Sequence, residues 1–156
     1  AGLPSTSVNT SLLIQQTVPS ANAPICNFLA RGQMPSASSL EFTRGCANFP
    51  IYRLVWERID FGGRASVQTK TVPLGIGIST LAVPIAAIDP TRTVVFASSQ
   101  AGAGQSAGEA TYSGIGSALG DGNARFELSS PTNVNVIRER SGGAAIFTFY
   151  VVELNP

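Results

Sequence analysis

Short runs of alternating apolar and polar residues, separated by glycine or proline, fill the chain from residue 51 to residue 154. A repeat of two is the pattern of a half-buried β-strand, and the frequent glycines and prolines leave no convincing helix. The runs recur about every ten residues, which is typical of a single all-β domain of the β-sandwich or jelly-roll type with about eight strands. The strands are expected at residues 51–61, 65–74, 81–85, 92–98, 124–128, 133–140 and 145–154, with a shorter candidate at 110–112.

Three of these segments carry more information than the others. Residues 51–61 also fit an amphipathic helix, but β-branched and aromatic residues dominate and the turn Gly62-Gly63 follows, which favours a strand. Residues 92–98 hold a run of three large apolar side chains, which predicts a central strand. Residues 145–154 are apolar on both faces, which indicates either a central strand or one covered by a second subunit.

Residues 1–25 form an uncharged N-terminal arm in front of the domain at 26–156, and the centre of the arm, residues 8–18, is apolar and β-prone. A strand in such an arm is most simply ordered by pairing with a sheet edge, which belongs either to its own domain or to a neighbouring subunit. The proline and serine residues that flank the strand suggest a hinge and favour the neighbour. The residues expected to make this inter-subunit contact are Val8, Leu12, Leu13, Ile14 and Val18.

Residues 26–50 are expected to be rich in loops, because prolines, a glycine and a serine run interrupt them. Cys26 and Cys46 lie near the two ends of this segment. A disulfide between them would close about 20 residues, contribute about 3 kcal/mol in the chain-entropy model, and imply an oxidising environment. Two buried, reduced thiols are the alternative. Without histidine or a C-x-x-C motif, no zinc site is expected.

The charge balance argues against several classes of function. The chain has 10 basic and 9 acidic residues and no histidine, and charged residues make up 12%, against roughly 25% in ordinary domains. A net charge of +1 disfavours broad electrostatic binding of nucleic acid. The longest apolar run, residues 144–152, is too short to cross a bilayer, so no membrane insertion is expected. Catalysis by Ser-His-Asp or Cys-His groups is excluded, the carboxylates are not clustered, and no catalytic residue, metal or cofactor is expected.

Arginine supplies all the basic side chains except Lys70. Arginine is enriched and lysine depleted at protein interfaces, so the surface is interpreted as one that packs against a partner, with compositional drift as the alternative. Arg138 and Arg140 alternate on the expected strand at 133–140 and would share one face. They are candidate interface contacts that clamp carboxylates, unless the strand is simply solvated.

Two aromatic residues are candidate ligand contacts. The glycine-rich segment 100–123 holds a G-x-G-x-x-A pattern, but further glycines follow where a dinucleotide site needs a helix. The segment is therefore interpreted as a surface loop or a contact to a partner or ligand, with Tyr112 inside it. Trp56 is expected in the core, and stacking on a sugar ring is the alternative.

The order of motifs in the C-terminal two thirds of the chain points to a kind of protein. The motifs are VQT at 67–69, TLAVPI at 80–85, IDPTRTVVF at 88–96, ARFEL at 124–128, NVIR at 135–138 and FYVVEL at 149–154. Across residues 59–154 the chain resembles β-sandwich modules of secreted bacterial surface and filament proteins and of phage virion accessory or fibre proteins. The resemblance implies a scaffold outside the cell, on a surface appendage or on a virion, rather than a reaction.

These observations predict a non-enzymatic structural subunit that self-assembles into an extracellular filament or surface appendage through its N-terminal strand. A head-to-tail exchange of strands produces a homo-oligomer that grows as a filament when it does not close. The alternatives are a decoration or fibre protein of a phage virion, and a module that binds a carbohydrate or receptor through Trp56 or Tyr112.

Overall fold

The computed structural model describes residues 7–18, 29–44, 53–101 and 121–156, and these residues contain ten strands and two short 3₁₀ helices. The strands are β1 (Ser11–Val18), β2 (Ala30–Ser36), β3 (Ser39–Arg44), β4 (Arg53–Asp60), β5 (Ala65–Leu74), β6 (Thr80–Pro84), β7 (Thr93–Ala101), β8 (Arg125–Ser130), β9 (Asn133–Ile137) and β10 (Ala145–Leu154); the helices are η1 (Val8–Thr10) and η2 (Pro90–Arg92). The all-β prediction is confirmed, with ten strands among the described residues where about eight were expected.

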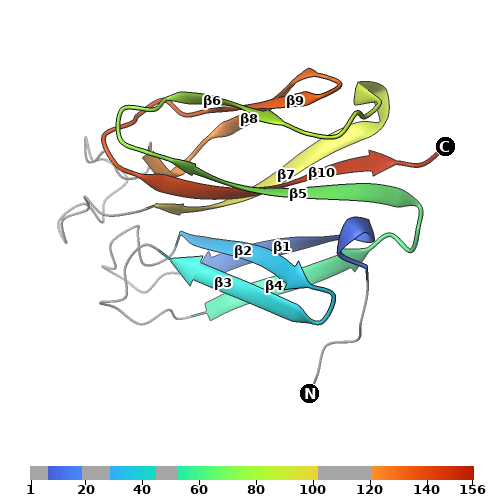
Figure 1. Cartoon of the computed structure of the whole chain (residues 1–156). Helices are drawn as coiled ribbons and strands as arrows, with labels where there is room; N and C mark the ends of the chain where they lie inside the picture. Colours follow the sequence, from blue (N-terminus) through green and yellow to red (C-terminus); the bar gives the residue numbers. More distant parts are fainter. Residues whose placement is uncertain (1–6, 19–28, 45–52, 102–120) are drawn as a thin grey trace.

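The strands form four small antiparallel sheets that are stacked in layers (Figure 1). The upper sheet has the order β6-β9-β8 and the middle sheet has the order β5-β10-β7. Two two-stranded sheets, β1-β4 and β2-β3, lie below the middle sheet. The chain passes from the lower layer to the middle sheet at Gly62-Gly63, where both residues have positive φ (56° and 84°), a conformation that glycine adopts without steric cost.

The upper and middle sheets enclose the larger of two apolar cores, here called the upper core. The alternation of β9 places Val134 and Val136 in this core, because both are fully buried while Asn133, Asn135 and Ile137 are only partly buried. On the facing strand, Phe147 and Phe149 point into the same core, and Phe126 packs on both rings with centroid distances of 5.9 and 5.4 Å.

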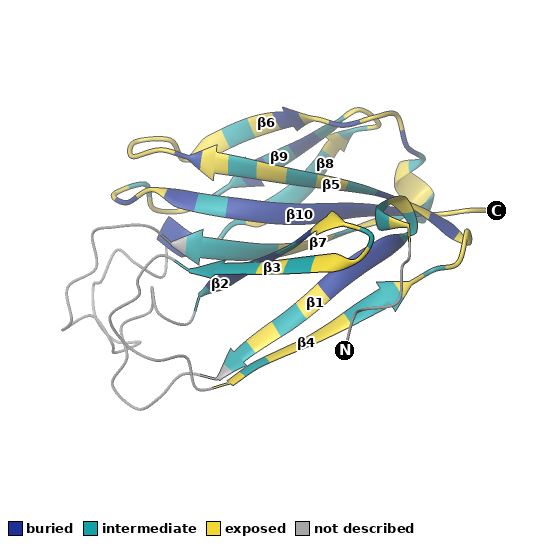
Figure 2. Cartoon of the chain, turned by 60° about the horizontal axis from the view of Figure 1, so that its bottom comes forward, coloured by how far each residue is buried: buried dark blue, intermediate teal, exposed yellow. Residues whose placement is uncertain are grey.

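Strand β10 lies between β5 and β7 and contributes to both cores. Phe147, Phe149 and Val151 face the upper core, whereas Tyr150 and Val152 face the lower core, which they share with residues of β1, β2 and β5. Figure 2 shows the strand buried along most of its length. The prediction of a central strand at residues 145–154 is therefore confirmed.

Strand β7 occupies an edge of the middle sheet, so the prediction of a central strand at residues 92–98 is wrong. Its strand partner among the described residues is β10. Val95 packs against the upper core, but Val94 and Phe96, on the opposite face, are exposed. An apolar run predicts that both faces are apolar, and it does not predict whether both faces are covered.

Residues 30–44 form a hairpin of β2 and β3, which is more regular than the loop-rich segment that the sequence indicated. Polar contacts join this hairpin to the middle sheet. The buried guanidinium of Arg31 donates to Thr148 Oγ1 at 3.1 Å and lies 3.3 Å from Glu41 Oε1. Thr43 Oγ1 donates to Gln100 Oε1 at 2.7 Å on the same side. The hairpin is thus held against the middle sheet by these polar contacts and by Met34, which is buried in the lower core with residues of β1.

Candidate interaction surface

Strand β1 is buried in the lower core at its N-terminal end and becomes exposed further along. Opposite residues of an antiparallel pair project to the same face, and the register sets Ile59 opposite Leu12 and Glu57 opposite Ile14. Leu12 is fully buried in the lower core, whereas Ile14, the next residue on that face, is 38% exposed. Val55, the diagonal neighbour of Ile14 on β4, is 51% exposed. The β1-β4 pair therefore packs at one end and exposes Ile14 and Val55 at the other, beside the exposed polar side chains of Gln16 and Glu57.

Strand β7 presents a second apolar face beside the same core. Val94 lies opposite Val152 and Phe96 lies opposite Tyr150, so all four side chains share one face of the middle sheet. Val152 and Tyr150 belong to the lower core, yet Val94 and Phe96 are 45% and 38% exposed. The lower layer covers β10 and contacts Ser98 and Gln100 of β7, but it leaves Val94 and Phe96 exposed. We refer to Ile14, Val55, Val94 and Phe96 together as the outer apolar surface.

Trp56 lies on the other face of the β1-β4 pair, opposite Gln15. The indole packs beside Phe42, with ring centroids 6.4 Å apart, and it is 41% exposed. The expectation that this tryptophan belongs to the core is wrong, because β4 has no buried residue and forms the outer strand of its pair (Figure 2). An exposed ring of this kind can stack on a sugar or pack against a partner.

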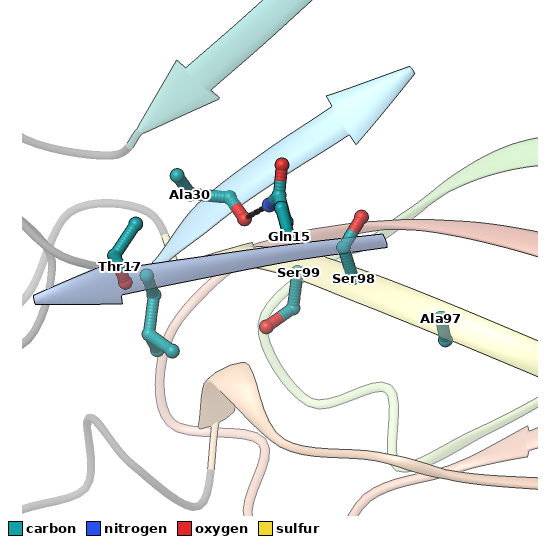
Figure 3. A pocket seen from close by; sticks show the side chains of 7 residues that line it. Gln15, Thr17, Ala30, Ala97, Ser98 and Ser99 are labelled. Atoms are coloured by element: carbon teal, nitrogen blue, oxygen red, sulfur yellow. Dashed lines mark hydrogen bonds between the residues drawn. The ribbon is translucent and has the colours of Figure 1, made fainter. Parts of the chain in front are cut away.

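A small cavity separates β1 from β7 (Figure 3). Its lining residues are Gln15, Thr17, Leu29, Ala30, Ala97, Ser98 and Ser99. Gln15 Nε2 donates a hydrogen bond to the carbonyl oxygen of Ala30 at its wall. The cavity volume of about 190 Å³ is below the roughly 300–1,000 Å³ of small-molecule sites, so we assign it no ligand.

Arg138 is buried, and its interpretation as an exposed clamp for carboxylates is wrong. Strand β9 ends at Ile137, so Arg138 and Arg140 do not share a strand face. The Arg138 guanidinium instead donates to four backbone carbonyls, those of Gly75 (2.6 Å), Ile78 (2.7 Å), Gly143 (2.7 Å) and Asp121 (3.2 Å). Burial lowers the pKa of Arg138, and the negative charge of Asp121 opposes that shift. Arg138 therefore ties together the chain segments at one end of the molecule, while Arg140 lies exposed beyond the strand.

The turn that Arg138 supports carries two exposed isoleucines. Gly77 has a φ of 82°, and its N–H donates to the carbonyl oxygen of Ser141 at 2.8 Å. Ile76 is 73% exposed and Ile78 is also exposed. These side chains lie outside the strands and at a different place from the outer apolar surface.

The structure places the other predicted contact residues as follows. Leu13 is buried with Leu12 in the lower core, and Val8, in η1, packs partly buried against it. Val18 ends β1, opposite Arg53. The strand pairs with β4 of its own chain, which is one of the two partners the sequence left open. Cys26, Cys46 and Tyr112 lie outside the described residues.

Several titratable side chains of the described residues form ion pairs. Arg92 Nε lies 2.9 Å from Asp89 Oδ2, and Arg92 Nη2 lies 3.4 Å from Glu153 Oε1. Hydrogen bonds from Thr91 and Arg92 lower the pKa of Asp89 to about 2. Among the described residues, no group of three or more His, Cys, Asp or Glu side chains is placed to hold a metal ion. A membrane-crossing helix, which needs about 20 apolar residues, is not found among them either.

The residues that sequence reasoning missed are Val55, Val94 and Phe96. Their apolar character was visible, but their exposure depends on where the lower layer ends. Comparison with known proteins adds no further residue, because no protein-family model, no curated protein and no solved structure matches this chain.

Proposed function

We propose that this chain is a non-enzymatic structural subunit, built on a β-sandwich, that assembles with copies of itself into an extracellular filament or surface appendage. Strand β1 is the contact element. The observation that carries the proposal is the exposure of Ile14 on β1, a strand without a charged side chain, next to the exposed Val55 of β4. A decoration or fibre protein of a phage virion is the alternative form of the same assembly.

The contact uses the exposed part of β1 rather than the withdrawal of the whole arm. Leu12 and Leu13 are buried in the lower core of their own chain. Loss of one buried leucine side chain costs about 2–5 kcal/mol, so an exchange must replace both packings in the neighbour. Contact through Ile14 and Val55 leaves the core intact and covers apolar surface that water otherwise meets.

The low content of charged residues supports the proposal that part of the surface is buried in an interface between subunits. Charged residues make up 12% of the chain, and one lysine accompanies nine arginines. Interfaces are depleted in lysine and glutamate and enriched in arginine and aromatic residues. The extracellular location rests on the resemblance across residues 59–154.

The test compares two substitutions at exposed isoleucines. Ile14→Lys places a charge on the contact strand, and Ile76→Lys places the same charge on a turn outside it. Sedimentation velocity should show smaller particles for Ile14→Lys and the size distribution of the unmodified protein for Ile76→Lys, with the same far-UV circular dichroism for all three. Equal particle sizes for Ile14→Lys and the unmodified protein would refute assembly through β1.

Binding of a carbohydrate or receptor is a second candidate function, and the exposed indole of Trp56 favours it. A stacked sugar ring would cover the face of the indole that Phe42 leaves open. Binding to a glycan array that disappears in Trp56→Ala and persists in Trp56→Phe would support this function. An absence of binding by the unmodified protein would count against it.

A further inference from the structure

The edge strands of the four sheets differ in how they are protected. An edge strand offers unpaired N–H and C=O groups to other chains, and proteins commonly block such edges with charged side chains or proline. Six of the eight edge strands among the described residues follow that rule. The blocking residues are Arg31 and Pro35 in β2, Glu41 and Arg44 in β3, Arg53, Glu57, Arg58 and Asp60 in β4, Lys70 and Pro73 in β5, Pro84 in β6, and Arg125 and Glu127 in β8.

Strands β1 and β7 are the two described edge strands without a charge or a proline. The proposed function uses β1 as the contact between subunits, and it does not use β7. Residues 93–97 of β7 carry the exposed side chains of Val94, Phe96 and Ala97. Beyond this stretch, Ser98 and Gln100 are engaged by the β2-β3 hairpin, since Ser98 Oγ accepts from Gly32 N at 3.1 Å. The accessible edge is therefore about five residues long, uncharged and apolar on one face.

We infer that residues 93–97 of β7 pair with the same residues of a second copy of this chain, in an antiparallel two-fold contact. The absence of charge on β7 indicates which strand can dock against it. A strand that docks here without burying an unpaired charge must itself be uncharged. Of the described edge strands, β1 and β7 meet that condition, and β7 of a second copy supplies two exposed large apolar side chains, Val94 and Phe96, where the described side chains of β1 supply Ile14. A two-fold axis at Val95 sets Phe96 opposite Val94 of the second copy and Val94 opposite its Phe96. The contact thus covers the exposed apolar side chains of β7 with one another and joins two middle sheets into one.

This contact goes beyond the proposed function and is independent of it. A two-fold contact closes on itself and yields pairs, whereas growth of a filament needs the contact of β1 as well. Pairing along five residues buries less area than the roughly 1,200 Å² of a stable interface, so the pair should dissociate on dilution.

The experiment uses the full chain with the β1 contact blocked. Ile14→Lys should sediment as a species of twice the chain mass of 16.2 kDa at high concentration. Addition of Phe96→Lys should reduce it to 16.2 kDa, and addition of Ile76→Lys should leave the pair intact. Far-UV circular dichroism of each variant should match that of the unmodified protein, which checks that the variants are folded.

A charge exchange tests the register. In the Ile14→Lys background, Val94→Glu alone and Phe96→Lys alone should each be monomeric, while the combination should restore the pair, because each new carboxylate then faces a new amine of the second copy. A monomeric Ile14→Lys protein at high concentration overturns the inference, and so does a pair that survives Phe96→Lys. Neither result touches the role of β1, which the comparison of Ile14→Lys with Ile76→Lys tests separately.

Discussion

Phe96 stands directly opposite Tyr150 in the pairing of β7 with β10, on the same face of the middle sheet, yet Tyr150 is 1% exposed and Phe96 is 38% exposed. The difference between these neighbours marks the boundary of the lower layer. The lower layer covers Tyr150, which packs among Leu12, Leu13 and Met34. Phe96 lies beyond it, on the surface that we interpret as an interface between copies.

This boundary predicts unequal costs for two similar substitutions. Tyr150→Ala removes a fully buried ring and should lower the free energy of unfolding by about 3–5 kcal/mol. Phe96→Ala should lower it by clearly less in the monomeric state, because much of that ring is already in contact with water. Urea denaturation of both variants in the Ile14→Lys background at low concentration measures the two values. Equal losses would mean that the lower layer also covers Phe96.

Arg138 should be among the most sensitive positions of the fold. Arg138→Met removes the four hydrogen bonds to backbone carbonyls and leaves these acceptors without a donor, and loss of a buried charged partner typically costs about 3–5 kcal/mol. Arg125→Ala is the matched control, because its ion pair with Glu127 is exposed and such pairs contribute about 0.2–1 kcal/mol. Thermal and urea unfolding compare the two. If Arg138→Met is as mild as Arg125→Ala, Arg138 does not hold this end of the molecule together.

Stability should depend on Asp89 in acid. The side-chain hydroxyl of Thr91, followed by Arg92 and the N–H of Thr91, lowers the pKa of Asp89 from 3.8 to about 2. A carboxyl whose pKa is lower in the folded than in the unfolded chain stabilises the fold above its unfolded pKa, and this contribution is lost as the pH falls through the folded pKa. Between about pH 4 and pH 2 the unmodified protein should therefore lose more stability than Asp89→Asn. Parallel stability curves for the two proteins over this window would show that Asp89 contributes nothing there.

The hairpin of β2 and β3 sharpens the prediction of a disulfide. Ala30 pairs with Arg44, so the outer ends of the two strands lie side by side. In the sequence, Cys26 precedes Ala30 by four residues and Cys46 follows Arg44 by two. Paired strands lie about 5 Å apart, and these short sequence spacings are compatible with the disulfide that the sequence predicts. Alkylation without reductant should add no group to the intact mass, and alkylation after reduction should add two. Two alkyl groups without reduction would indicate free thiols.

The alternation of apolar residues predicted the strands well where one face is buried. Residues 65–74 coincide with β5, and the doubly apolar segment 145–154 coincides with the central β10. Val134 and Val136 are buried as their spacing indicates. These elements follow from the sequence because burial on a sheet repeats every second residue.

The candidate contacts were harder to predict, because exposure depends on neighbours that are distant in the chain. Phe96 and Trp56 have the composition of core residues and become exposed only because a layer stops beside them. Arg138 and Arg140 continue the sequence alternation of β9, but the strand ends at Ile137, one residue before Arg138. Four backbone carbonyls from outside the strand accept hydrogen bonds from the Arg138 guanidinium. No local pattern carries information about these tertiary contacts.

Sedimentation velocity of the purified, unmodified protein over a wide range of concentration tests the central claim most directly. Self-assembly through exposed strands predicts particles that grow with concentration to well beyond the chain mass of 16.2 kDa, and electron microscopy of the same sample should show elongated forms. A single species of 16.2 kDa at every concentration would contradict the account.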